Sequence, residues 1–90
     1  MSIMVRISPV LQQFTGGREM VEVIGCTTGE CLDNLEVQFP GIKQKICDEQ
    51  GQVVTPYDIY VNGEPVYPEE LTTPLTDGDE MAIMVIMVAG

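Results

Sequence analysis

Residues 75–90 read LTDGDEMAIMVIMVAG, a turn followed by an uninterrupted apolar segment with a small-residue end. Asp77-Gly78-Asp79 predicts the turn, and Met81–Met87 predicts a final β-strand. A strand with one solvated face normally alternates apolar and polar residues, whereas every residue from Met81 to Ala89 is apolar. This strand is therefore either buried on both faces or exposes an apolar face to a partner.

One main helix is predicted in the middle of the chain. Thr27 and Glu30 have the spacing of a capping box, in which each side chain satisfies the other residue's free backbone N–H. Phe39-Pro40-Gly41 ends the helix, because proline disfavours helical geometry in the residue before it. Ile42–Cys47 predicts one further short turn. The predicted core-facing residues of the main helix are Cys31, Leu32, Leu35 and Phe39.

The remaining segments predict four more strands. Residues 3–7 place Ile3, Val5 and Ile7 on one face, and Val10–Thr15 is expected to be a connecting loop. In the second strand, Met20 and Val21 compete with Val23 for the core side, which leaves the register open. The predicted strands besides the last are 3–7, Glu19–Ile24, Tyr57–Val61 and Glu64–Tyr67, with Asn62-Gly63 as the hairpin turn between the latter two.

This order of elements predicts one α+β domain over residues 1–90. One helix covers only one face of a mixed four- to five-stranded sheet. Successive side chains of a strand point to opposite faces of the sheet. Met81 and Ile83 are expected on the helix side, so the residues that alternate with them in the last strand are expected on the open face. We favour a partner surface there, with ordinary core positions as the alternative for its methionines. The residues predicted on the open face are Ala82, Met84, Ile86 and Met4.

Composition excludes several classes of function. The chain has 4 Lys+Arg, 14 Asp+Glu and a formal net charge of −10, which argues against nucleic-acid and anionic-membrane binding. Hydrophobic residues make up 44% of the chain, enough for a core without metals or disulfides. The chain has no histidine, so it builds neither a Ser-His-Asp triad nor a His-ligated zinc site. The excess of acidic over basic residues indicates either solubility or a basic protein partner.

The cysteines indicate reduced thiols in a cytoplasmic protein. Cys26, Cys31 and Cys47 are an odd number without a C-x-x-C pair, and no signal peptide is evident. Cys26 and Cys31 have the first spacing of a plant-type [2Fe–2S] pattern, but Asn34 stands where the next cysteine is required. Met81–Ala89 is about half of a membrane span.

Over nearly its whole length the chain resembles the β-grasp sulfur carriers of the MoaD and ThiS type. The resemblance rests on Pro9–Gly17 after the first strand, on Ile59–Gly63, on the Asp77–Glu80 turn and on the terminal Ala89-Gly90. Phe14-Thr15-Gly16-Gly17 within the first of these segments is most similar to the carriers of cysteine biosynthesis and to related archaeal-type modifiers.

The resemblance implies a ubiquitin-like β-grasp fold and a carrier that is not itself an enzyme. The Gly90 carboxylate would be adenylated by a ubiquitin-activating-type enzyme, and sulfur would replace the adenylate to give a thiocarboxylate. Val88 and Ala89 would thread into the active site as part of a flexible tail over about 86–90. The sulfur would then pass to a synthase of the molybdopterin, cysteine or thiamin type. The carrier binds no cofactor itself, and its activating partner uses ATP and a sulfur donor.

The same resemblance places the contact with the activating enzyme on the open face, with Met84 as its large apolar residue. Two departures stand out. The family usually ends in Gly-Gly, so either Ala89 has replaced a glycine or a further glycine follows Gly90. The family also often has a proline after the last strand, and Val85–Met87 has none.

Two other functions fit the same sequence. The chain could be a ubiquitin-like module that binds proteins through its apolar sheet face, or a modifier attached to lysines of other proteins. A carrier or modifier needs a free terminal glycine, whereas a binding module tolerates changes there. We expect the free protein to be a monomer.

Overall fold

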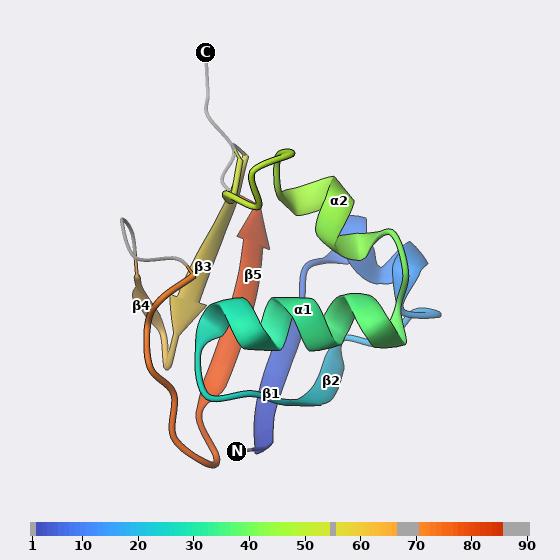
Figure 1. The fold of residues 1–90 in the computed structure, drawn as a ribbon. Coiled ribbons are helices and arrows are strands. Elements are labelled where there is room, and N and C mark those ends of the chain that lie inside the picture. Colours follow the sequence, from blue (N-terminus) through green and yellow to red (C-terminus); the bar gives the residue numbers. More distant parts are fainter. Residues whose placement is uncertain (1, 55, 67–70, 86–90) are drawn as a thin grey trace.

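The computed structural model describes residues 2–54, 56–66 and 71–85, and within them a five-stranded mixed sheet carries helices on one face (Figure 1). The strand order is β2-β1-β5-β3-β4, in which β1 and β5 are parallel and the other pairs are antiparallel. This confirms the predicted α+β architecture. The elements are β1 (Ser2–Ile7), the 3₁₀ helix η1 (Pro9–Phe14), β2 (Met20–Ile24), α1 (Thr28–Gln38), α2 (Ile42–Ile46), β3 (Tyr57–Val61), β4 (Glu64–Pro65) and β5 (Glu80–Val85).

The core lies between the sheet and α1. The register sets Val5 opposite Met81 and Ile7 opposite Ile83, and none of these four side chains is more than 1% exposed. They pack with the buried face of α1, as the spacing of its apolar residues predicts. The buried α1 residues are Thr28, Cys31, Leu32 and Leu35, and Phe39 packs against the same cluster.

The start of α1 is held by its own cap and by a distant segment. Thr27 Oγ1 accepts from the Glu30 backbone N–H at 3.2 Å, which confirms half of the predicted capping box. The Glu30 carboxylate, however, reaches the N–H of Cys26 at 3.0 Å, one residue before the expected partner. Beyond the cap, the Gly29 N–H donates to the carbonyl of Leu71 at 2.9 Å. The segment before β5 is thereby docked on the start of the helix.

Two details differ from the sequence predictions. Pro9–Phe14 forms η1 where a loop was expected from Val10, because Pro9 begins the turn and Leu11 is fully buried as its anchor. β4 ends at Pro65 instead of Tyr67, which lies outside the described residues. The sequence left the register of β2 undecided, and in the structure Val21 and Val23 face the core.

A carboxylate near the end of α1 accepts hydrogen bonds from the backbone at the start of α2. Glu36 accepts from the backbone N–H groups of Gly41, at 2.7 Å, and Lys43, at 2.8 Å. The Lys43 amine also pairs with Asp33, and this hydrogen bond raises the pKa of Lys43. The short turn expected at Ile42–Cys47 is thus a small helix tied back to α1. Among the described residues, no helix is both long and apolar enough to cross a membrane.

Both edges of the sheet are protected against pairing with another strand. On the β2 side, the Asn34 side-chain amide donates to the carbonyl of Ile24, and that of Gln38 donates to the carbonyl of Glu22 at 3.1 Å. On the other side, β4 is two residues long and contains Pro65, which has no N–H to offer. These features disfavour edge-to-edge association.

Two turns at the start of β5 are linked by side chains. Asn62 and Gly63 have positive φ angles of 51° and 85°, as an Asn-Gly hairpin turn requires. Asn62 Nδ2 donates to Asp79 Oδ1 at 3.1 Å, and Asn62 Oδ1 accepts from the Glu80 N–H at 3.0 Å. Asp79 Oδ2 accepts from the Thr76 N–H at 2.8 Å. We call this set the Asn62–Asp79 clasp.

The hydrogen bonds of the clasp favour the ionised form of Asp79. Hydrogen bonds from the Thr76 backbone and the Asn62 amide lower the pKa of Asp79. A carboxyl group with a lowered pKa stabilises the fold above its unfolded pKa, and this contribution is lost as the pH falls through its folded pKa. The clasp therefore persists at neutral pH and weakens in acid.

We expect Asn62→Ala to lower the free energy of unfolding by about 2 kcal/mol, because it removes two hydrogen bonds and forces alanine into a positive φ. Asn62→Gly keeps the backbone conformation and should lose about 1 kcal/mol. Chemical denaturation of the two variants measures both effects. An Asn62→Ala protein as stable as the natural one would contradict the role of the clasp.

Candidate functional site

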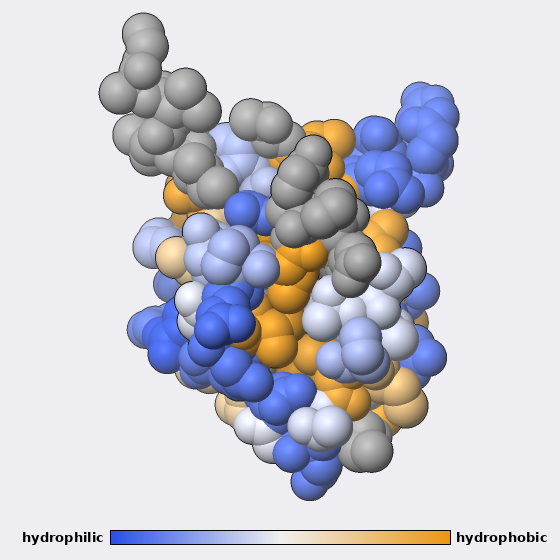
Figure 2. All heavy atoms as spheres, turned by 90° about the vertical axis from the view of Figure 1, so that its left-hand side faces the viewer, coloured by the Kyte–Doolittle hydropathy of each residue, from blue (hydrophilic) through white to orange (hydrophobic). Residues whose placement is uncertain are grey.

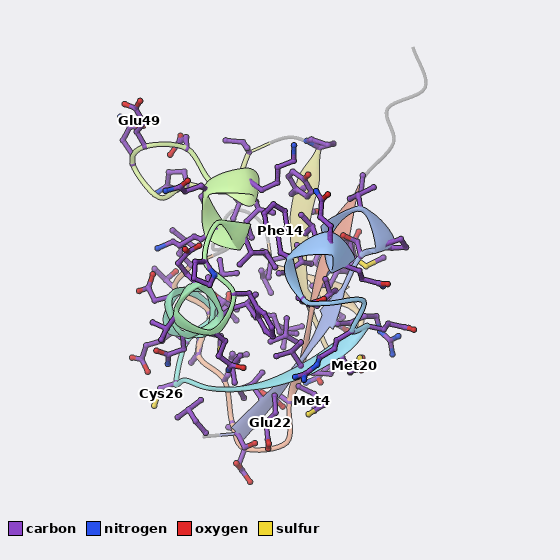
Figure 3. The ribbon with its side chains drawn as sticks, turned by 90° about the vertical axis from the view of Figure 1, so that its right-hand side faces the viewer. Met4, Phe14, Met20, Glu22, Cys26 and Glu49 are labelled. Carbon is purple, nitrogen blue, oxygen red and sulfur yellow. The ribbon has the colours of Figure 1, made fainter. Side chains whose placement is uncertain are left out.

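The face of the sheet opposite α1 is the candidate functional surface, and we call it the open face. Met4 is 37% exposed and Met84 is 40% exposed, while Ala82 beside them is half-buried. Figure 3 shows Met4 and Met20 on the side of the sheet away from α1. The predicted open-face positions Met4, Ala82 and Met84 are therefore confirmed. Since β5 is covered on one face only, burial on both faces is excluded for its described residues.

The open face is not continuously apolar, because a charged residue lies among the predicted apolar positions. Arg6 lies opposite Ala82, between the methionines, because it shares the alternation of Met4 along β1. Its guanidinium contacts Glu19 Oε1 at 2.8 Å and Glu80 Oε1 at 3.3 Å. The sequence prediction considered only the apolar residues of this face, and it therefore overlooked the charge of Arg6. The surface is a set of methionine and alanine side chains around a central ion-pair cluster.

These ion pairs contribute little to stability. Arg6 and Glu80 are 44% and 43% exposed and Glu19 is 63% exposed, so water screens their attraction. Exposed pairs of this kind typically contribute less than about 1 kcal/mol. Their arrangement matters more for what the surface recognises, because fixed charges select a partner of complementary charge.

A cavity of about 250 Å³ opens on this face where β1 ends beside β5. Ile7, Pro9 and Met84 provide apolar walls, and Arg6, Ser8 and Glu19 are among the polar residues that line it. The Ser8 side chain is 8% exposed, and its Oγ has no hydrogen-bond partner. Leaving a buried hydroxyl unpaired costs about 1–3 kcal/mol. Sequence reasoning missed this cavity, because nothing local marks Ser8 as buried.

Two of the three thiols are buried and not suited to nucleophilic chemistry. Cys31 and Cys47 are buried and Cys26 is exposed, and all three are free. Burial raises the pKa of Cys31 to about 11 and also raises the pKa of Cys47. Both buried thiols therefore stay protonated at neutral pH and act as small core residues.

Hydrophobic side chains also reach the surface on the β4 side of the molecule. Figure 2 shows them as a strip between two polar margins. Val61 and Val66, on either side of the β3–β4 turn, are only partly buried and pack directly against the core. None of the predicted site residues lies in this hairpin, so the candidate site remains on the open face.

The predicted reactive end of the chain lies outside the described residues. This applies to Ile86 on the open face, to Val88 and Ala89 as the threading arm, and to Gly90 as the attachment point. The described chain ends at Val85, which pairs with Tyr57 of β3. Met84 and the cavity therefore lie directly before the segment that carries the predicted chemistry.

Known proteins resemble this chain over its full length. The model of the ThiS family matches residues 5–90. Sulfur carrier protein CysO from Mycobacterium tuberculosis (strain ATCC 25618 / H37Rv) is 32% identical over 93 residues, covering 100% of both chains. One chain of the Amycolatopsis orientalis BexX/CysO complex matches with a TM-score of 0.88 at 31% identity, covering 98% of this chain and 99% of that chain.

The structural comparison also reaches proteins of lower identity. The H. volcanii small archaeal modifier protein 1 has a TM-score of 0.82 at 21% identity, covering 96% of this chain and 98% of that chain. At this identity the likeness supports the fold alone. Together with the CysO structures, it confirms the predicted ubiquitin-like β-grasp.

Proposed function

The chain belongs to the ThiS family, and we propose on this basis that it is a sulfur carrier whose C-terminal glycine is converted to a thiocarboxylate. The observation that carries the proposal is the extent of the match. The family match runs to residue 90, and the alignment with a named sulfur carrier covers both chains completely. The likeness therefore includes the C-terminal segment as well as the folded domain.

The chemistry takes place on the terminal carboxylate. An oxygen of the Gly90 carboxylate attacks the α-phosphorus of ATP, which gives an acyl adenylate and releases pyrophosphate. A sulfide equivalent then attacks the acyl carbon, so that a C–S bond forms and AMP leaves with the cleaved C–O bond. Glycine suits this position because it has no side chain and has a freely adjustable backbone. Val88 and Ala89 form the arm that carries it into the active site.

The carrier is the substrate of this reaction and not its catalyst. It has no histidine, and burial holds two of its three thiols in the protonated form. An adenylating enzyme of the ubiquitin-activating type supplies the catalytic groups and binds ATP and the sulfur donor. Relatives of this chain are named as carriers, in keeping with this division of roles.

We assign docking on the activating enzyme to the open face. Met84, Ala82 and Met4 provide adaptable apolar contacts, and Ile86 would extend them toward the tail. Asp58 lies opposite Met84 on β3, so carboxylates border these contacts. A partner surface with apolar residues and basic side chains would complement this pattern.

The sulfur is accepted by a second protein, a synthase. The A. orientalis CysO was crystallised in a complex with BexX, and we infer that this chain also delivers its sulfur while docked on a protein partner. The name of its relatives favours delivery in cysteine biosynthesis over delivery to molybdopterin or thiamin.

Deletion of Gly90 should abolish activation, because it removes the residue that receives the adenylate. ATP–pyrophosphate exchange by the activating enzyme from the same cells measures this step. Ala89→Gly is the matched control, since it restores the family's usual Gly-Gly ending and should keep exchange at the natural level or above it. Exchange that is unchanged without Gly90 would contradict the proposal and favour a binding module.

Met84→Asp should raise the KM for the carrier in the same assay by about tenfold, because it places a charge in an apolar contact. Val37→Asp is the control, since Val37 is 79% exposed on α1 and lies away from the open face. It should leave the KM within about twofold of the natural value. Equal effects of the two substitutions would remove Met84 from the interface.

A further inference from the structure

Two methionines of β5 differ sharply in exposure although they lie on the same strand. Met81 faces the core and is 0% exposed, whereas Met84 is 40% exposed on the open face. Met84 also lines the cavity of about 250 Å³ at the end of β1, which Met4 does not line. A peroxide oxidises a thioether only where it can reach the sulfur. Met84 is therefore open to oxidation, and Met81 is protected by the core.

We propose that Met84 is a redox-sensitive position that regulates docking on the activating enzyme, an inference that rests on the proposed function. The Met84 sulfur attacks one oxygen of hydrogen peroxide, so that an S–O bond forms and the O–O bond breaks. The sulfur is oxidised by two electrons, and the leaving hydroxide takes the proton of the transferred oxygen and departs as water. The sulfoxide is polar where the proposed contact is apolar, so oxidation weakens docking. A methionine sulfoxide reductase reverses the change.

The cavity provides room and a hydrogen-bond donor for the added oxygen. Arg6 lines the same cavity as Met84, and its guanidinium contacts one oxygen of Glu19 and one oxygen of Glu80. A guanidinium has five N–H donors, so Arg6 can also donate to a sulfoxide oxygen. The folded carrier thus accommodates an oxidised Met84. Oxidation of Met81 would instead place the same polar group inside the core.

The thiols do not compete with Met84 for peroxide on this face. Peroxide reacts with the thiolate, and burial keeps Cys31 and Cys47 protonated at neutral pH. Cys26 is exposed, but Figure 3 shows it on the side of α1, away from the open face. A thioether needs no deprotonation before it reacts. Met84 therefore responds to peroxide at neutral pH.

The position of Met84 gives its oxidation a consequence for the reaction. Met84 directly precedes Val85, the last described residue before the segment that carries the proposed chemistry. Peroxide also oxidises sulfide and thiocarboxylates, so activation in its presence would use ATP without delivering sulfur. A carrier that docks poorly while Met84 is oxidised avoids this loss.

Peroxide treatment of the purified carrier tests the proposal, with the peroxide removed before the exchange assay. The readout is the ratio of the KM for the carrier after treatment to the KM before it. The natural chain should give a ratio of about ten, and methionine sulfoxide reductases A and B should return it to about one. Met84→Leu has no sulfur at this position and should give about one. Met4→Leu and Cys26→Ser are the matched controls and should keep a ratio of about ten.

A ratio near one in the natural chain would overturn the proposal. So would a retained response in Met84→Leu, or the loss of the response in Met4→Leu or Cys26→Ser. Absence of exchange with the untreated natural chain would instead contradict the proposed function.

The oxidation is also tested without the enzyme. Peptide mass spectrometry should find Met84 oxidised before Met81, and the Arg6 Nε–H signal of the ¹⁵N-labelled carrier should shift on treatment in the natural chain but not in Met84→Leu. Equal oxidation of Met84 and Met81, or an Arg6 signal that does not move, would exclude the site.

Discussion

The parallel pairing of β1 with β5 at the centre of the sheet is the constraint on which the rest of the structure depends. It sets Val5 beside Met81 and Ile7 beside Ile83, so that one face of both strands enters the core. Parallel neighbours run in the same direction, and β1 and β5 therefore end at the same side of the sheet. For this reason the cavity around Ser8, the exposed Met84 and the start of the C-terminal segment all lie together.

The open face balances two requirements. A carrier must present enough apolar surface to be recognised, yet a continuous apolar sheet face would favour self-association. Here the ion pairs of Arg6 with Glu19 and Glu80 interrupt the methionine and alanine side chains. The side-chain amides of Asn34 and Gln38 also limit self-association, because they donate to backbone carbonyls at the outer edge of β2. This pattern supports the proposed partner with both apolar and basic groups.

Local signals in the sequence predicted much of this architecture. Thr27 with Glu30 identified the start of α1, Asn62-Gly63 identified the hairpin, and the spacing of Ile3, Val5 and Ile7 assigned a core face. Such local signals do not predict interactions between residues that are far apart in the sequence. Arg6 meets Glu80 only because β1 and β5 are neighbours, and η1 forms because Leu11 is buried by the rest of the fold. The cavity was missed for the same reason, since the burial of Ser8 depends on where η1 and β5 meet β1.

The central claim is that the C-terminal glycine carries sulfur, and tandem mass spectrometry of the C-terminal peptide from the protein's own cells tests it most directly. The peptide must be sequenced by fragmentation, because a thiocarboxylate adds nearly the same mass as oxidation of one of the six methionines. The account predicts sulfur on the terminal glycine, and the fragments show whether that glycine is Gly90 or one residue beyond it. A plain carboxylate in every preparation, even after incubation with ATP, sulfide and cell extract, would contradict it.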